Sequence, residues 1–472
     1  MEATHIAAAG GEPYVSNEPS RLPDAVVRDL RRALRGALRL PDDPEYARAR
    51  RVWNAAIDRR PAAIAVCADA EDVAHALRVA SDHGLPVTVR GGGHNVAGRA
   101  VADGVLMIDL AGLRHVSVNP AAAVASVQGG ALWHDVDLAT ARHGLATTGG
   151  LVSGTGVGGF TLGGGTGWLM RRHGLAIDNL VAASVVLADG RLMRCDADEH
   201  TDLFWGLRGG AGGYGVVTSF DFRLHPLRHV LAGVVIRPPT EAATAIRTFR
   251  DVAVGAPDEF CGMLVLAHAP PLPFLDPAWH GRPVVITAVC WAGDIAAGER
   301  ALEPLRKFGA PLADHVGPMP YLQWQHLQDG GAPLGRCQYW KTASFDGLTD
   351  ALVGRLADAA TALPTPQSEI HLQHLGGEVG RRPPEETSFA QRNAAFFVNL
   401  IGVTPWPEEM PALRERSRAL YRVLASEPLP RRLPNFSDAD DGDVAIGAGD
   451  AIAARLAALR RRYDPSGRFA AR

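Results

Sequence analysis

Cysteine is scarce in this chain of 472 residues, and the few cysteines lie far apart. No C-x-x-C pair occurs, which excludes a zinc ribbon, and an odd number of widely spaced cysteines does not support a disulfide framework. The five are Cys67, Cys195, Cys261, Cys290 and Cys337. No run of 18 apolar residues and no secretory or twin-arginine signal is found, so we expect no membrane span and a cytoplasmic location.

The chain also lacks an excess of either charge. Its 48 Lys and Arg against 51 Asp and Glu give a formal net charge of −3. A nucleic-acid partner or an anionic membrane surface requires a basic patch or stripe, and neither is expected here. The histidines do not show the spacing of metal ligands, so we expect no metal site.

Glycine, in contrast, is abundant. Of the 472 residues, 52 are glycine, which is a larger share than the usual value of about 7%. No Gly-X-Y period exists, which excludes collagen, and three clusters stand in apolar surroundings at 91–93, 149–167 and 209–215. Glycine lets backbone N–H groups approach a phosphate closely. The clusters therefore predict a pyrophosphate cradle, and the alternative is a set of ordinary tight turns.

A Rossmann dinucleotide site is the competing interpretation of the middle cluster. Gly154, Gly156 and Gly159 have the G-x-G-x-x-G spacing. That fingerprint must open a helix after a first strand, and the following FTLGGGTG is not expected to start one. The sequence therefore argues against this fold.

The first 225 residues are expected to be rich in strands. Residues 23–39 have apolar residues at helical spacing, and 64–89 predict a β-α-β unit whose helix runs from Ala70 to His83. Asp69 is the expected cap of that helix, and Asp189-Gly190 predicts a hairpin turn.

The glycine clusters end near residue 226, and an α+β pattern follows, with helices layered on one sheet. Strands are predicted at Leu231–Ile236, Gly262–Ala267, Val284–Cys290, Gln338–Ser344, Glu369–Leu375 and Ala395–Val403. Helices are predicted at Glu241–Val252, Ile295–Phe308, Leu348–Leu363, Pro411–Leu424 and Asp450–Tyr463.

Several motifs together carry a resemblance to a known family. They are VTVRGGGHN at 87–95, GGLV at 149–152, TGVGGFTLGGG at 155–165, Gly174-Leu175 with Asp178-Asn179, FWGLRGG at 204–210 with GVVT at 215–218, PNF at 434–436 and YDP at 463–465. With these motifs the sequence resembles FAD-linked oxidases of the vanillyl-alcohol-oxidase/PCMH superfamily, in the berberine-bridge-enzyme-like branch. The likeness covers nearly all of residues 60–470.

The resemblance implies an α+β fold of the PCMH type, with two lobes and FAD between them. We expect an FAD-binding domain at 1–225, an antiparallel-sheet substrate domain backed by helices at 226–425, and a C-terminal segment at 426–472 that returns to the FAD domain. The implied reaction is hydride transfer from a CH–OH or CH–NH carbon to flavin N5, followed by reoxidation by O2 to H2O2. A secondary metabolite, a sugar or a polyketide-like molecule is the expected substrate, and a monomer or homodimer is expected.

The same resemblance implies the cofactor residues. His94 occupies the family's position of covalent attachment to the flavin 8α-methyl group, and a neutral imidazole is a sensible nucleophile for that bond. Many relatives attach FAD a second time through a cysteine, and the matching position here is Val152, so single attachment through His94 is predicted. The other implied contacts are Arg90, Gly91, Gly92, Gly93, Asn95, Gly98, Gly150, Leu151, Val152, Ser153, Thr155, Gly158, Gly159, Gly163, Gly164, Val217 and Asn435.

Strand parity supplies the candidates for substrate contact, because alternate residues of a strand share a face. Glu369, His371 and Gln373 share one face, Tyr339 and Lys341 share another, and Asn399 is the polar residue of its strand. The family's tail Tyr is absent, because the run here is Leu433-Pro434-Asn435, which leaves the identity of the base open. The candidate catalytic residues are Asn399, Glu369, Tyr339, Lys341 and Asn435.

Two other functions stay open at this point. A flavin dehydrogenase of the same fold would use an acceptor other than O2, and a non-catalytic flavin-binding protein would transfer no hydride. A non-covalent reductase is disfavoured because it would lack His94.

Overall fold

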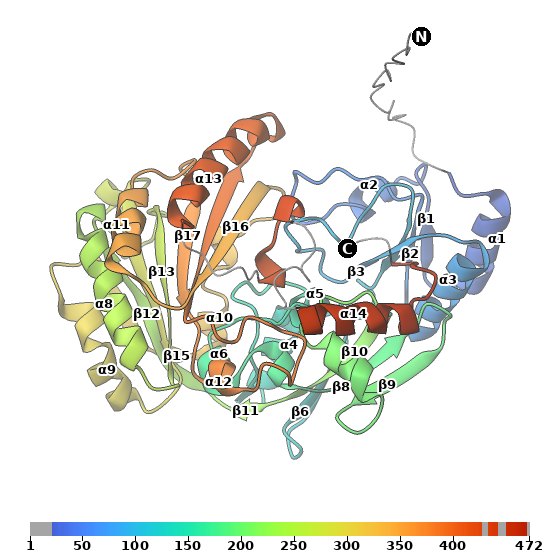
Figure 1. The fold of residues 1–472 in the computed structure, drawn as a ribbon, viewed down its shortest axis with the longest axis horizontal. Coiled ribbons are helices and arrows are strands. Elements are labelled where there is room, and N and C mark those ends of the chain that lie inside the picture. Colours follow the sequence, from blue (N-terminus) through green and yellow to red (C-terminus); the bar gives the residue numbers. More distant parts are fainter. Residues whose placement is uncertain (1–20, 427–432, 442–449, 470–472) are drawn as a thin grey trace, which may run out of the picture.

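The computed structural model describes residues 21–426, 433–441 and 450–469. Two bodies lie side by side in Figure 1. One is a large sheet whose outer face is covered by helices α8 (Ala242–Gly255), α9 (Ile295–Lys307) and α11 (Asp350–Ala359). The other, the glycine-rich body, contains the strands that precede this sheet in the chain. No helix of the described residues is long and apolar enough to cross a membrane.

A four-stranded sheet opens the chain, in the order β1-β2-β4-β3. Its strands are β1 (Ala37–Arg39), β2 (Ala63–Val66), β3 (Val87–Arg90) and β4 (Leu106–Asp109), and its helices are α1 (Asp24–Ala33), α2 (Tyr46–Ala49) and α3 (Ala70–Asp82). Strands β2 and β3 both run parallel to β4. The carboxylate of Asp69 accepts the Asp72 N–H at 2.9 Å at the start of α3, which confirms the predicted cap.

The helix predicted at 23–39 is wrong in its second half. Helix α1 ends at Ala33, and Ala37–Arg39 pairs with β2 as a strand. The chain reaches that strand through Gly36, where a side chain would collide with the carbonyl of Val66. Local apolar spacing therefore yields here to strand pairing.

A five-stranded antiparallel sheet follows, in the order β5-β6-β10-β8-β9. Its strands are β5 (Val116–Asn119), β6 (Val124–Gln128), β8 (Leu180–Val186), β9 (Leu192–Asp196) and β10 (Val216–Arg223). The helices around it are α4 (Trp133–Ala141), α5 (Val157–Leu162), α6 (Met170–His173) and α7 (Thr201–Leu207). Strands β8 and β9 form the predicted hairpin, with Gly190 at φ 80° in its turn. A separate two-stranded sheet pairs β7 (Leu145–Ala146) with β11 (His225–Pro226).

The second body is a seven-stranded antiparallel sheet in the order β15-β12-β14-β13-β17-β18-β16. Its strands are β12 (His229–Arg237), β13 (Phe260–His268), β14 (Pro283–Trp291), β15 (Ala313–Pro320), β16 (Cys337–Phe345), β17 (Glu369–His374) and β18 (Phe396–Thr404). Its helices are α8 (Ala242–Gly255), α9 (Ile295–Lys307), α10 (Tyr321–Gln325), α11 (Asp350–Ala359), α12 (Glu378–Arg381) and α13 (Met410–Leu424). All six strands predicted in this part of the chain are present, and β15 was not predicted.

The two faces of this sheet bury different partners. Val398 and Leu400 of β18 pack with the apolar side chains of α8, α9 and α11. Phe397 lies between these two residues, so its side chain is on the opposite face of the sheet. It packs with Leu169 and Ile177 of the glycine-rich body. One face is therefore covered by helices, and the other meets the glycine-rich body.

The C-terminal residues return to that body. Helix α14 (Asp450–Tyr463) lies across it in Figure 1. It packs against α7. Arg462 of α14 pairs with Asp202 at 2.7 Å, and the Tyr463 hydroxyl donates to the same carboxylate at 2.9 Å. The end of the chain thereby closes on residues that precede it by about half the sequence.

Candidate active site

The loop after β3 carries His94. Arg90, at the end of that strand, pairs with Asp109 and donates to the carbonyls of Ala49 and Arg51, the latter at 3.1 Å. These contacts use the guanidinium of Arg90 to hold the loop in place. What the loop offers a cofactor is its backbone and the His94 ring.

The first two glycine clusters meet backbone to backbone. A Cβ on Gly92 would lie 2.5 Å from the N and Cα of Gly156, a separation that real side chains do not allow. Gly93 has φ 64°, the left-handed region that favours glycine. The sequence clusters at 91–93 and 149–167 are therefore one structural unit.

Residues 157–162 form helix α5, which begins inside the G-x-G-x-x-G run, before the FTLGGGTG that was not expected to start a helix, and ends at Leu162. The helix has six residues and follows a loop, not a first β-strand. Cβ atoms on Gly154 and Gly159 would meet no heavy atom within 4 Å. The N–H groups of Gly92, Gly93, Gly158 and Gly159 have no hydrogen-bond partner among the described residues. Free N–H groups next to open space suit an anionic ligand.

Asn435 holds this helix from the far end of the chain. Its amide donates to the carbonyl of Phe160 at 3.1 Å and to that of Gly159 at 3.3 Å, and it accepts the Gly165 N–H at 3.1 Å. Both ends of the amide are engaged by backbone. The structure thus gives Asn435 a supporting position at the glycine cluster and leaves no free group for catalysis.

The His94 ring stacks on the indole of Trp53. Their ring centroids are 4.4 Å apart and the planes differ by 17°. Burial lowers the pKa of His94 to about 4, so the imidazole is neutral at physiological pH. No other residue in the described part of the chain forms a hydrogen bond to its ring nitrogens.

Polar side chains form a row on the sheet face that meets the glycine-rich body. Thr342 of β16 pairs with Asn399 of β18, which pairs with His371 of β17. The Thr342 hydroxyl donates to Asn399 Oδ1 at 3.0 Å, and the buried Asn399 Nδ2 has no partner among the described residues. His371 Nε2 lies 2.7 Å from the carboxylate of Glu369. The structure therefore brings the predicted Asn399 and Glu369 together.

Tyr339 and Lys341 lie on the opposite face of β16, which separates them from this row. Leu400, the cross-strand partner of Lys341, belongs to the helix-covered core, and Tyr339, which lies opposite Gly402, packs against α13. Lys341 pairs with Asp440 and with Asp441, the latter at 2.5 Å, and the Tyr339 hydroxyl donates to Asp440 at 2.7 Å. Parity found that the two share a face, but the tail carboxylates occupy that face.

Aromatic rings join the His94 loop to the polar row. Trp340 meets Trp53 edge-on, with centroids 5.7 Å apart, and stacks near Phe436 at 6.0 Å. Phe436 lies 5.4 Å from Phe397 on the same sheet face. Trp53 and Phe436 were not predicted as site residues. Trp53 stands in an irregular segment, and Phe436 was noted only as part of a tail motif.

The remaining predicted cofactor residues support the loops or lie in the core. Ser153 donates through N–H and hydroxyl to Asp329 at 2.8 and 2.7 Å. Gly98 (φ 70°) packs on Ile57, Asn95 accepts from the Arg99 N–H at 3.4 Å, and Val217 is buried in the core. Gly91, Gly150, Leu151, Val152, Thr155, Gly163 and Gly164 lie in the loops already described.

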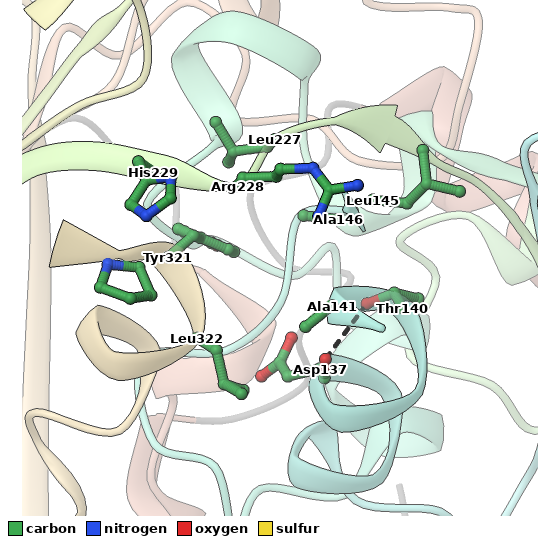
Figure 2. Close-up of a pocket in the computed structure, with 11 residues that line it drawn as sticks. Asp137, Thr140, Ala141, Leu145, Ala146, Leu227, Arg228, His229, Tyr321 and Leu322 are labelled. Atoms are coloured by element: carbon green, nitrogen blue, oxygen red, sulfur yellow. Dashed lines mark hydrogen bonds between the residues drawn. The ribbon is translucent and has the colours of Figure 1, made fainter. Parts of the chain in front are cut away.

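Figure 2 shows a separate pocket of about 240 Å³ between α4, β7 and the start of β12. Asp137, Thr140 and Tyr321 line it, and it contains no predicted site residue. Burial raises the pKa of Asp137 to about 7. The pocket is thus distinct from the polar row of the sheet.

Comparison with known proteins identifies the family. The model of an FAD binding domain matches residues 61–196. (R)-6-hydroxynicotine oxidase of Paenarthrobacter nicotinovorans is 30% identical over 450 residues, which cover 93% of this chain and 96% of that protein. The chain belongs to the FAD-linked oxidases of the vanillyl-alcohol-oxidase/PCMH family. It is an oxidoreductase, and its cofactor is FAD.

Two solved structures confirm the fold of this FAD-linked oxidase. The wild-type berberine-bridge-enzyme-like protein 1 of Physcomitrella patens has a TM-score of 0.84 at 21% identity, covering 94% of this chain and 97% of that one. Glucooligosaccharide oxidase of Acremonium strictum has a TM-score of 0.82 at 22% identity, covering 94% and 98%. The expected α+β fold of the PCMH type is confirmed.

FAD fits the residues present. The open space at Gly154 and Gly159, with the free N–H groups beside it, suits a diphosphate, and the neutral His94 ring lies on the neighbouring loop. These two loops are in contact through Gly92 and Gly156. The residues of these two loops are the ones that would hold the cofactor.

Proposed function

We propose that this oxidase takes a hydride from a CH–OH or CH–NH carbon of a small molecule, with FAD attached once, through His94. The observation that carries the proposal is the His371–Glu369 pair beside the unpartnered Asn399 amide, on the sheet face that meets the glycine-rich body of the described chain. We also propose the division into an FAD domain (1–225), a substrate domain (226–425) and a returning segment (426–472).

Bound FAD supplies the hydride acceptor and passes the electrons to O2, which yields H2O2. The chain must remove the proton of the substrate hydroxyl or amine. His371 is placed for this, because Glu369, 2.7 Å from its Nε2, stabilises the imidazolium that forms. This assignment replaces the tail Tyr of the family pattern.

Asn399 and the aromatic rings position the substrate. The hydroxyl of Thr342 fixes the Asn399 amide, so the buried Nδ2 is left to donate to a substrate oxygen or nitrogen. A buried donor without a partner costs about 1–3 kcal/mol, which a bound acceptor recovers. Trp340 and Phe436 cover the same face and exclude water from the reacting groups.

Val152 supports single attachment. Glucooligosaccharide oxidase, one of the structural neighbours, carries a 6-S-cysteinyl, 8α-N1-histidyl FAD. A valine has no sulfur for the first of these bonds, whereas His94 has a ring nitrogen for the second. Attachment forms a bond between that nitrogen and the 8α carbon. The carbon and the imidazole would each lose one hydrogen in forming this bond, and O2 would be the oxidant that takes up both as H2O2.

The test starts with denatured protein. Acid-precipitated wild type should keep its flavin, and His94→Ala should release it, whereas release from wild type would refute the covalent bond. Anaerobic titration with alcohols, sugars and secondary amines should bleach the flavin. His371→Gln should slow that bleaching about 10²–10⁴-fold, the usual contribution of a general base. Reoxidation in air then separates an oxidase from a dehydrogenase, and absence of bleaching with every donor would favour a flavin-binding protein without activity.

A further inference from the structure

Trp53 is fixed at both its backbone and its ring. Its N–H donates to the carbonyl of Gly93 at 2.9 Å, which ties it to the His94 loop, and its Nε1 donates to the carbonyl of Ala332 at 3.1 Å. Only 5% of Trp53 is exposed. The indole therefore has one position, nearly parallel to the imidazole of His94.

The neighbouring Asn54 strengthens this fixation. Its side-chain Nδ2 donates to the carbonyls of Val96 and Gln338 at 2.7 and 3.1 Å. Its Oδ1 accepts the N–H groups of Gln338 and Ala56 at 2.9 and 3.1 Å. One buried amide thus joins the His94 loop to strand β16 with all its hydrogen-bonding capacity used.

A histidine that forms a bond to carbon needs a lone pair, a fixed ring plane and no competing solvent. Among the described residues the imidazole of His94 has no hydrogen bond to another residue, and the indole covers one of its faces. In that part of the chain no ion pair to another residue orients the ring either. Besides a hydrogen bond to the backbone of His94 itself, the stacking contact is the interaction that orients the ring.

We propose that Trp53 is a positioning residue for covalent flavin attachment, holding the His94 imidazole flat and desolvated toward the cofactor. This inference rests on the proposed attachment through His94. Trp53 contacts the imidazole and is not itself a reacting group.

The environment of His94 makes the inference measurable. Burial is the cause that lowers its pKa, and charged neighbours do not contribute. Arg90 on its own loop is bound to Asp109, and the segments packed against the loop carry Arg51 and Arg336. Removing the indole admits water, so the pKa should rise toward the ordinary value of about 6.5.

The experiment follows attachment in apoprotein mixed with FAD in air, read as flavin fluorescence of the denatured chain in a gel. Wild type and Trp53→Phe should attach FAD at rates independent of pH between about 5.5 and 8. Trp53→Leu should attach it about tenfold more slowly at pH 5.5 than at pH 8, because about one imidazole in ten is then neutral. If Trp53→Leu does not fold, Trp53→Met replaces it with the same expectation.

Trp291→Leu is the matched control. Trp291 is also 5% exposed and also donates through Nε1 to a carbonyl, that of Asp294 at 2.9 Å, but it packs among the helix-side core. Its rate should match wild type at every pH. A wild-type rate and a flat pH profile in folded Trp53→Leu would overturn the inference. Absence of covalent flavin in wild type would instead refute the attachment itself.

Discussion

Arg392 and Asp178 form an ion pair that is fully buried on both sides. The guanidinium donates to the two carboxylate oxygens at 2.6 and 3.1 Å, and neither side chain is exposed. Asp178 ends the turn that follows α6, and Arg392 precedes β18 by a few residues. The pair therefore ties the glycine-rich body to the large sheet.

Replacing one partner should be costly because the other charge stays buried. We expect Arg392→Met to lower the free energy of unfolding by about 3–5 kcal/mol, measured by urea denaturation of the holoprotein. The double variant Arg392→Met/Asp178→Asn should recover part of that loss. Arg381→Met, whose ion pair with Asp258 is half exposed, is the control and should lose less than about 1 kcal/mol. Equal losses for Arg381 and Arg392 would contradict the reasoning.

Substitution of Gly159 should affect the stability of the chain and the binding of FAD in different ways. Alanine there meets no atom of the chain and favours helix α5 by about 0.5–1 kcal/mol. Gly159→Ala should therefore leave apoprotein stability unchanged or raised while lowering FAD occupancy, read by thermal unfolding and by the flavin-to-protein absorbance ratio. Full occupancy in this variant would show that the space beside Gly159 does not hold FAD.

We expect Lys341 to stabilise the fold and to take no part in the reaction. Lys341→Met leaves Asp441, whose side chain is buried, without this cation, and we expect a loss of about 3 kcal/mol together with faster proteolysis near residues 433–441. His371→Gln should show the reverse, with unchanged unfolding and slow flavin reduction. If Lys341→Met kept the stability of wild type but lost flavin reduction by substrate, Lys341 would belong to the substrate site instead.

Asp137 predicts a pH dependence of stability. Its folded pKa, raised by burial to about 7, exceeds the unfolded value, so the folded state holds the proton more tightly and stability falls as pH rises between about 4 and 7. Asp137→Asn stays neutral throughout. Its advantage over wild type in melting temperature should grow between those two pH values and stay constant above them, and a gap independent of pH would exclude the protonated carboxyl.

Much of the fold was predictable because its signals are local. The cap at Asp69, the turn at Gly190 and the alternation in β17 and β18 each depend on a few adjacent residues. Strand β15 was missed because Gly317, Pro318 and Pro320 mimic a loop, and its place at a sheet edge is what permits them.

The site was predictable only in part. Parity grouped Tyr339 with Lys341 correctly, but no strand pattern reveals which face meets the other body. That depends on Asp440 and Asp441, about one hundred residues further along, which neutralise the lysine on the helix side. The Trp53–His94 contact joins residues without a common periodicity, so the sequence carries no signal for it.

The Asn435 amide also has a consequence for biosynthesis. It binds the carbonyls of Gly159 and Phe160 across sequence separations of 276 and 275 residues, from near the end of the chain. The hydrogen bonds between Asn435 and the glycine loop therefore form only after residue 435 has been synthesised. A chain truncated before residue 433 would lack this amide, and we expect its glycine loops to bind FAD more weakly than those of the longer chain.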